Sequence, residues 1–155
     1  EQSAEAFWCV ADLTNLPFAD QTFNAVLNIF SPSHYQEFQR VLSEDGEVLK
    51  VVPQENYLKE LRQAFYPNQP EKQSYSNERV VAKFAEAMKL TERQRVTYEF
   101  EIPEENQKDL LAMSPLEWQV EERIKADLYK NPLKKITIDI ELLKGTKRKR
   151  FSSSF

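Results

Sequence analysis

The chain has 155 residues, of which 41% are hydrophobic and 30% are charged, and its formal net charge is -4. These values are typical of one globular domain with its own core, and they exclude a long disordered chain. No apolar run approaches the roughly 20 residues that a membrane-spanning helix needs, and the first residues show no secretion signal. We therefore expect a cytoplasmic protein without membrane contact.

Three scarce residue types limit the chemistry of this chain. A single cysteine, Cys9, excludes an internal disulfide and fits a reducing compartment. With one histidine, His34, the chain alone cannot supply the ligands of a structural zinc site, so we expect no metal. Glycine occurs only at Gly46 and Gly145, although average usage predicts roughly 11. A loop that cradles a phosphate or dinucleotide needs several glycines close together, and this sequence has no such loop.

The first third of the chain predicts alternating strands and helices. In order, we expect a strand at 6–11, a loop at 15–20, a strand at 25–30, a helix at about 33–42 with Ser33 as its N-cap, a turn at Gly46, and a strand at 47–52. The strands are almost continuously apolar, which is typical of a parallel sheet covered on both faces.

The rest of the chain predicts mostly helices and two alternating strands. We expect a helix at about 55–65, a polar surface loop at 67–78, an amphipathic helix around 81–88, a strand at 96–102, helices that begin near Pro103 and Pro115, and a strand at 136–142. The two alternating strands suit an antiparallel pair at a sheet edge. Residues 146–155 are basic and serine-rich, and we expect a disordered tail there.

Several motifs resemble those of the class I S-adenosylmethionine-dependent methyltransferases. Members of that family carry motifs close to V-x-x-D, L-P-F-x-D, F-D and R-V-L-K-P-G-G-x-L, and this chain has CVAD, LPFAD, FNAV and RVLSEDGEVLKVVP in the same order. Asn24 and Asp45 depart from the family pattern, which commonly has Asp and Gly there. The resemblance narrows to the 23S rRNA (guanine-N1)-methyltransferases through IFSPSHYQEFQRVL, VVPQENYLKELRQAFY and LLAMSPLEW.

The resemblance covers about residues 7–143 and implies the α/β class. The chain would hold the later strands of a class I methyltransferase sheet, with an antiparallel edge pair and flanking helices. In that family the glycine loop, and a cysteine-rich zinc module, lie upstream of the residues present here. The resemblance therefore implies that residues 1–145 are the carboxyl-terminal part of a methyltransferase domain, with 67–95 facing the substrate. We expect weak or no S-adenosylmethionine binding by this chain alone.

The resemblance also implies which residues form the site. The cofactor contacts would be Asp12, through the adenine amine, together with Leu13, Phe30 and Tyr57, whereas Ser31, Pro32 and Trp118 would line the substrate side, with Trp118 stacking on a base. The structural alternatives are a turn-forming aspartate at position 12 and packing side chains at Tyr57 and Trp118.

The sequence identifies no catalytic residue or general base. His34 begins a helix, and we expect it to cap that helix or to lie on the surface. Ile29 is expected in the core. The basic run KGTKRKR, at 144–150, either contacts phosphate or belongs to a solvated tail.

Three functions fit these observations. The first is part of an enzyme that uses S-adenosylmethionine to methylate N1 of a guanine in 23S rRNA, which LLAMSPLEW favours. The second is a small-molecule methyltransferase of the same class, because LPFAD and RVL alone do not exclude it. The third is a non-catalytic module that only folds and pairs with a second copy, which the absent glycine loop favours.

Overall fold

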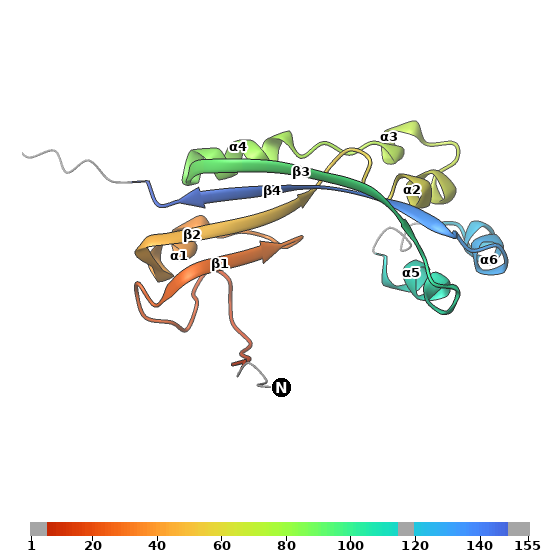
Figure 1. The fold of residues 1–155 in the computed structure, drawn as a ribbon. Helices are drawn as coiled ribbons and strands as arrows, with labels where there is room; N and C mark the ends of the chain where they lie inside the picture. Colours follow the sequence, from red (N-terminus) through yellow and green to blue (C-terminus); the bar gives the residue numbers. More distant parts are fainter. Residues whose placement is uncertain (1–5, 115–119, 149–155) are drawn as a thin grey trace, which may run out of the picture.

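A mixed four-stranded sheet runs through the molecule (Figure 1). The computed structural model describes residues 6–114 and 120–148. The strands are β1 (Phe23–Ile29), β2 (Leu42–Pro53), β3 (Lys89–Glu101) and β4 (Lys135–Thr146). The helices are α1 (Tyr35–Val41), α2 (Lys59–Phe65), α3 (Pro70–Gln73), α4 (Glu78–Ala87), the 3₁₀ helix η1 (Glu104–Asn106), α5 (Gln107–Met113) and α6 (Glu122–Lys130).

The sheet topology confirms the α/β class and the antiparallel edge pair. The strand order is β1-β2-β4-β3. β1 and β2 are parallel, and α1 supplies the crossover that a parallel pair requires. β4 pairs antiparallel with both β2 and β3, so β3 forms one edge and β1 the other.

One face of the sheet carries the main hydrophobic core. Phe38 of α1 and Phe84 of α4 are buried there against Val48 of β2 and Leu143 of β4. Complete burial of a side chain such as Phe84 contributes roughly 1.5–3 kcal/mol. A Cβ on Gly145 would lie 2.8 Å from the Phe84 ring, so glycine lets α4 pack directly on the backbone of β4. The predicted amphipathic helix is thus confirmed.

A second, mainly helical core lies beyond the ends of β1 and β2. β3 and β4 extend past the other two strands, and α5 and α6 lie at that far end (Figure 1). There Leu61 and Phe65 of α2 pack with Leu111 of α5 and Leu128 of α6. None of the helices in the described ranges is both long and apolar enough to cross a bilayer.

The opposite sheet face, which we call the open face, exposes large apolar side chains. Leu27 and Ile29 of β1 are 67% and 56% exposed, and Tyr98 and Phe100 of β3 are 50% and 45% exposed. The strand register places these alternate residues on one side of the sheet. The expectation of a sheet covered on both faces is therefore wrong for the described residues, as is the expectation that Ile29 belongs to the core.

Several local predictions also differ from the structure. The predicted loop at 67–78 contains the short helix α3. Residues 6–11 form no strand, and Phe7, Trp8 and Val10 are exposed. An isolated strand is not stable without a hydrogen-bonding neighbour, and none among the described residues pairs with this segment. The predicted turn at Gly46 is instead an irregularity within β2, where the pairing with β1 jumps from Leu42 to Glu47.

Candidate functional site

The turn at residues 30–33 lies where β1 ends, at the carboxyl end of the parallel pair. Phe30 has a left-handed backbone with φ 49°, and its amide donates to the carbonyl of Val51, 3.1 Å away. Left-handed backbone in an aromatic residue is strained and is found mainly where surrounding structure enforces it. The Phe30 ring lies against the Tyr57 ring, with centroids 5.1 Å apart. The structure thus brings together two predicted cofactor residues that are far apart in sequence.

A polar cluster lies beneath this turn. The side-chain amide of Asn28 donates to Ser31 Oγ (2.9 Å) and to the carbonyl of Pro32 (2.7 Å). Lys50 of β2 donates to Ser33 Oγ at 2.8 Å and also to Asn28 Oδ1. Both predicted substrate-lining residues of the turn, Ser31 and Pro32, are exposed above the cluster. Sequence reasoning did not select Lys50, although a charged residue within the apolar strand EVLKVV was a signal for it.

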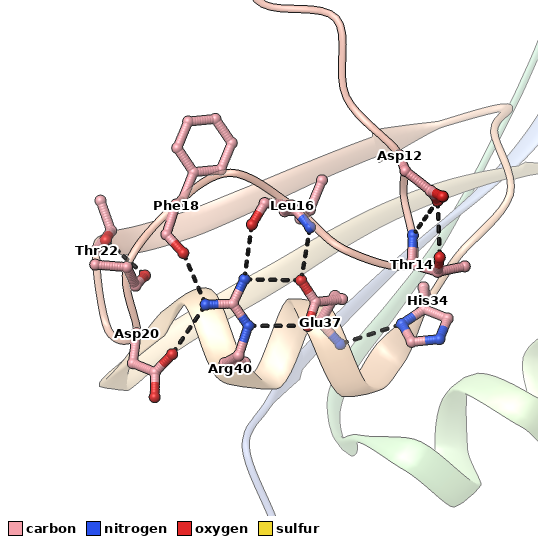
Figure 2. A network of polar contacts seen from close by, with 10 residues as sticks. Asp12, Thr14, Leu16, Phe18, Asp20, Thr22, His34, Glu37 and Arg40 are labelled. Carbon is pink, nitrogen blue, oxygen red and sulfur yellow. Dashed lines mark hydrogen bonds and ion pairs between the residues drawn. The ribbon is translucent and has the colours of Figure 1, made fainter.

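Asp12 lies at the same end of the sheet, near the start of α1 (Figure 2). Its Oδ1 accepts hydrogen bonds from the amide and hydroxyl of Thr14, both at 2.8 Å. These bonds lower the pKa of Asp12, and the nearby His34 contributes further. His34 follows Pro32 by two residues, so Asp12 and the turn belong to one region. Asp12 therefore makes the local hydrogen bonds of a turn-forming aspartate, and its carboxyl group is exposed.

The remaining predicted site residues have different environments. Leu13 is half-buried and packs against the main core. Tyr57 is also half-buried, and burial raises the pKa of its hydroxyl, with a further contribution from the neighbouring Tyr98 of β3. Trp118 lies outside the described residues. The structure therefore brings Asp12, Phe30 and Tyr57 to one end of the sheet, whereas Leu13 packs against the main core.

The loop between Asp12 and β1 is fastened to α1 by Arg40 (Figure 2). The guanidinium of Arg40 donates to the carbonyls of Leu16 (2.9 Å) and Phe18 (2.7 Å), and it pairs with Asp20 at 2.9 Å. Glu37 accepts from the Leu16 amide at 2.8 Å. The Arg40 hydrogen bonds, followed by that of the Leu16 amide, lower the pKa of Glu37 to about 2. The LPFAD and RVL motifs therefore contact each other, which fixes the loop that carries Asp12.

His34 caps α1, which confirms one of its two predicted roles. Its Nδ1 accepts from the amide of Glu37 at 3.3 Å. Ser33 was expected to be the N-cap, and this is wrong by one residue. The hydroxyl of Ser33 instead contacts Lys50 and Asn28, so it is unavailable to the helix.

The residues at this end of the sheet offer a hydrogen-bond acceptor and an apolar ring surface. Asp12 offers a carboxylate that can accept from an exocyclic amine, and the half-exposed Phe30 ring offers an apolar surface. No glycine lies near them in sequence, because the chain's two glycines are within β2 and β4.

Two curated proteins are similar to this chain. A protein of Bacillus subtilis (strain 168) named "Putative 23S rRNA (guanine-N(1)-)-methyltransferase YxjB" is 38% identical over 143 residues, which are 92% of this chain and 50% of that protein. A protein of Micromonospora griseorubida with the name "Putative 23S rRNA (guanine-N(1)-)-methyltransferase" is 31% identical over 108 residues, 68% of this chain and 35% of that protein. The chain thus spans about half the length, or less, of the curated relatives that it matches.

The fold is similar to that of solved methyltransferases. The crystal structure of "a putative methyltransferase" from Bacillus halodurans C-125 matches with a TM-score of 0.50 and 15% identity, over 90% of this chain and 70% of that chain. At this identity the likeness concerns the fold alone. No protein-family model matches the chain. The chain therefore has the class I methyltransferase fold and is homologous to part of the proteins named as 23S rRNA (guanine-N1)-methyltransferases.

Proposed function

We propose that this chain is the carboxyl-terminal part of an S-adenosylmethionine-dependent enzyme that methylates N1 of a guanine in 23S rRNA. The observation that carries the proposal is the 38% identity, over nearly the whole chain, to the Bacillus subtilis relative of that name. The fold and the position of Asp12, Phe30 and Tyr57 at the carboxyl end of the parallel strands support the cofactor class, because open α/β sheets bind ligands at that end.

The residues of this chain would bind and orient the reactants. When bound, S-adenosylmethionine supplies an activated methyl group, so positioning accounts for most of the catalysis. Asp12 would accept from the adenine amine, and Phe30 with Tyr57 would cover the ligand from one side. Ser31 and Pro32, exposed on the same turn, would face the guanine. Residues 67–95 and Trp118 would belong to the RNA side of the site.

The open face supports the view that this chain works with a further part of the same protein. Leu27, Ile29 and Phe30 are each at least half exposed, and no strand in the described part of the chain pairs with the outer edge of β1. Exposed apolar patches of this kind mark interaction surfaces, and unpaired strand edges invite further strands. We propose that the half of the relatives that this chain does not match covers this face and completes the cofactor site.

A hybrid protein tests the proposed function. In it, the part of the Bacillus subtilis relative that this chain does not match is joined to this chain, and we call it the hybrid. It is expected to transfer a methyl group from S-adenosylmethionine to large-subunit rRNA that lacks the modification. Nuclease digestion and mass spectrometry of the product are expected to give N1-methylguanosine.

The complete Bacillus subtilis relative serves as the positive control, and the hybrid's folding is checked by urea denaturation. If the relative methylates the RNA and the folded hybrid yields no methylated guanine, the rRNA proposal is wrong. Methylation of small metabolites but not of RNA would favour the small-molecule enzyme. A chain that forms stable dimers through the open face and never supports transfer would favour the non-catalytic module.

A further inference from the structure

The polar cluster beneath the turn at residues 30–33 contains a buried cation. Lys50 is only 4% exposed, and so is Asn28, its neighbour in the parallel register. Both side chains lie on the core side of the sheet. Burying an ammonium group costs several kcal/mol unless its donors are satisfied. An apolar side chain would be the ordinary choice at this position of β2.

Within residues 6–114 and 120–148, the ammonium of Lys50 contacts only uncharged oxygens. It donates to Asn28 Oδ1, to Ser33 Oγ at 2.8 Å and to the carbonyl of Ser31 at 3.2 Å. Its three donors are thus matched by three acceptors. No ion pair between described residues includes Lys50, and burial lowers the pKa of its ammonium. Attraction to a carboxylate therefore does not explain why Lys50 is buried. The three acceptor oxygens around its ammonium, two of them from the turn, do explain it.

Asn28 completes the set of contacts from the neighbouring strand. Its side-chain amide donates to Ser31 Oγ and to the carbonyl of Pro32. Side chains of β1 and β2 thus form hydrogen bonds with each of Ser31, Pro32 and Ser33. The turn held in this way begins at Phe30, whose left-handed backbone requires such enforcement.

We propose that Lys50, together with Asn28, is a positioning residue for methyl transfer. It binds the turn at 30–33 to both parallel strands and so fixes Phe30, Ser31 and Pro32 in the arrangement that the reactants meet. This inference rests on the proposed function. An apolar side chain at position 50 leaves the Ser31 carbonyl and Ser33 Oγ without their lysine donor, and the turn then relaxes although the core remains filled.

Hydrogen exchange on the chain itself tests whether Lys50 holds the turn. Lys50→Met keeps most of the side-chain volume and removes the ammonium. We expect the amides of residues 29–31, 33 and 34 (Pro32 has no amide hydrogen) to exchange roughly tenfold faster or more, because local opening no longer breaks the lysine bonds. The control is Lys144→Met, which removes a partly exposed lysine of β4 that pairs with Glu47 and does not contact the turn. It is expected to leave exchange at 29–34 unchanged.

Steady-state kinetics of the hybrid test the link to catalysis. Lys50→Met is expected to lower kcat per folded molecule by roughly 10–100-fold, with KM for S-adenosylmethionine changed less than about threefold, because misplaced groups lose transition-state contacts more than ground-state binding. Ser33→Ala removes one acceptor and no charge, so it is expected to have a smaller effect in the same direction. Lys144→Met is expected to keep the parent kcat.

Unchanged exchange at 29–34, or an unchanged kcat in folded Lys50→Met, overturns the proposal. A lower yield of folded protein with normal kcat also overturns it, because that result describes a purely structural residue. If Lys50→Met does not fold, amide exchange at the turn and kcat of the hybrid are measured for Ser33→Ala instead, and those two results decide the proposal. If the unsubstituted hybrid does not methylate RNA, the proposed function fails, and the exchange experiment alone decides whether Lys50 holds the turn.

Discussion

Replacing Asp139 by alanine is expected to lower the free energy of unfolding by about 3 kcal/mol, measured by urea denaturation. Asp139 of β4 is 0% exposed and accepts from Arg95 Nε (2.8 Å) and Nη2 (2.7 Å), from the Thr97 hydroxyl (2.8 Å) and from the Asn56 amide (3.1 Å). The substitution leaves these donors without their acceptor. Arg95 is 45% exposed, so its guanidinium regains some hydration in the variant. The expected loss of unfolding free energy therefore lies at the low end of the range for breaking a buried ion pair.

The same carboxylate gives the fold a pH dependence. The Arg95 hydrogen bonds hold the pKa of Asp139 well below its usual range, and Thr97 and Asn56 contribute further. A lowered pKa means that the unfolded chain binds the proton more readily than the folded chain. The stabilisation is therefore complete above the ordinary pKa of about 3.9, and it is lost as the pH falls toward the lower folded pKa. Asp139→Ala is expected to remove this part of the acid sensitivity.

Glu99→Ala is the matched control for Asp139→Ala. Glu99 of the adjacent strand also pairs with a cation, Lys135, at 3.0 Å, but both side chains are more than half exposed. Exposed pairs of this kind contribute about 0.2–1 kcal/mol, so this change is expected to cost little. A loss for Asp139→Ala as small as that for Glu99→Ala would mean that the Asp139 network does not stabilise the fold.

Asp12→Ala in the hybrid is expected to weaken S-adenosylmethionine binding by roughly 10–100-fold, measured by calorimetry. A hydrogen bond to a charged group contributes about 1.5–3 kcal/mol, and each 1.4 kcal/mol corresponds to a tenfold change in affinity. Stability should change little, because the Asp12 carboxyl group is exposed and accepts its hydrogen bonds from a neighbouring residue, Thr14.

The control for Asp12→Ala separates ligand contact from loop geometry. Thr14→Val removes the hydroxyl bond to Asp12 Oδ1 and leaves the carboxylate in place. It is expected to lower the affinity less than threefold or so, because the Thr14 amide still supports the turn. Equal losses for the two variants would assign Asp12 a purely structural role, and no loss for Asp12→Ala would contradict its assignment to the cofactor.

Much of the fold was predictable because its signals are local. Hydrophobic spacing located α4 and the alternating β3 and β4, and the apolar runs located β1 and β2. The segment at 6–11 was predicted wrongly because apolar composition suggested a strand, and no strand among the described residues pairs with it. For the same reason Ile29 was expected to be buried. An apolar residue indicates that a surface is suited to burial, and the packing partner decides whether it is covered.

The motifs predicted which residues lie near one another at this end of the sheet. They did not predict the contacts that hold those residues in place. Motif positions placed Phe30 and Tyr57 at the ligand end, and the structure adds their ring contact. Leu13 is half-buried against the main core, a contact that periodicity over a short loop cannot reveal, and its cofactor role stays a prediction. The roles of Lys50 and Asn28 depend on the register between two strands, and a single sequence does not contain that register.

We propose that this chain carries one side of a cofactor site that another part of the same protein completes. Calorimetric titration of S-adenosylmethionine into the isolated chain and into the hybrid, side by side, tests it most directly. We predict saturable binding to the hybrid and no measurable heat from the isolated chain at the same concentrations. Binding to the isolated chain with the hybrid's affinity would contradict the account, as would a folded hybrid that does not bind at all.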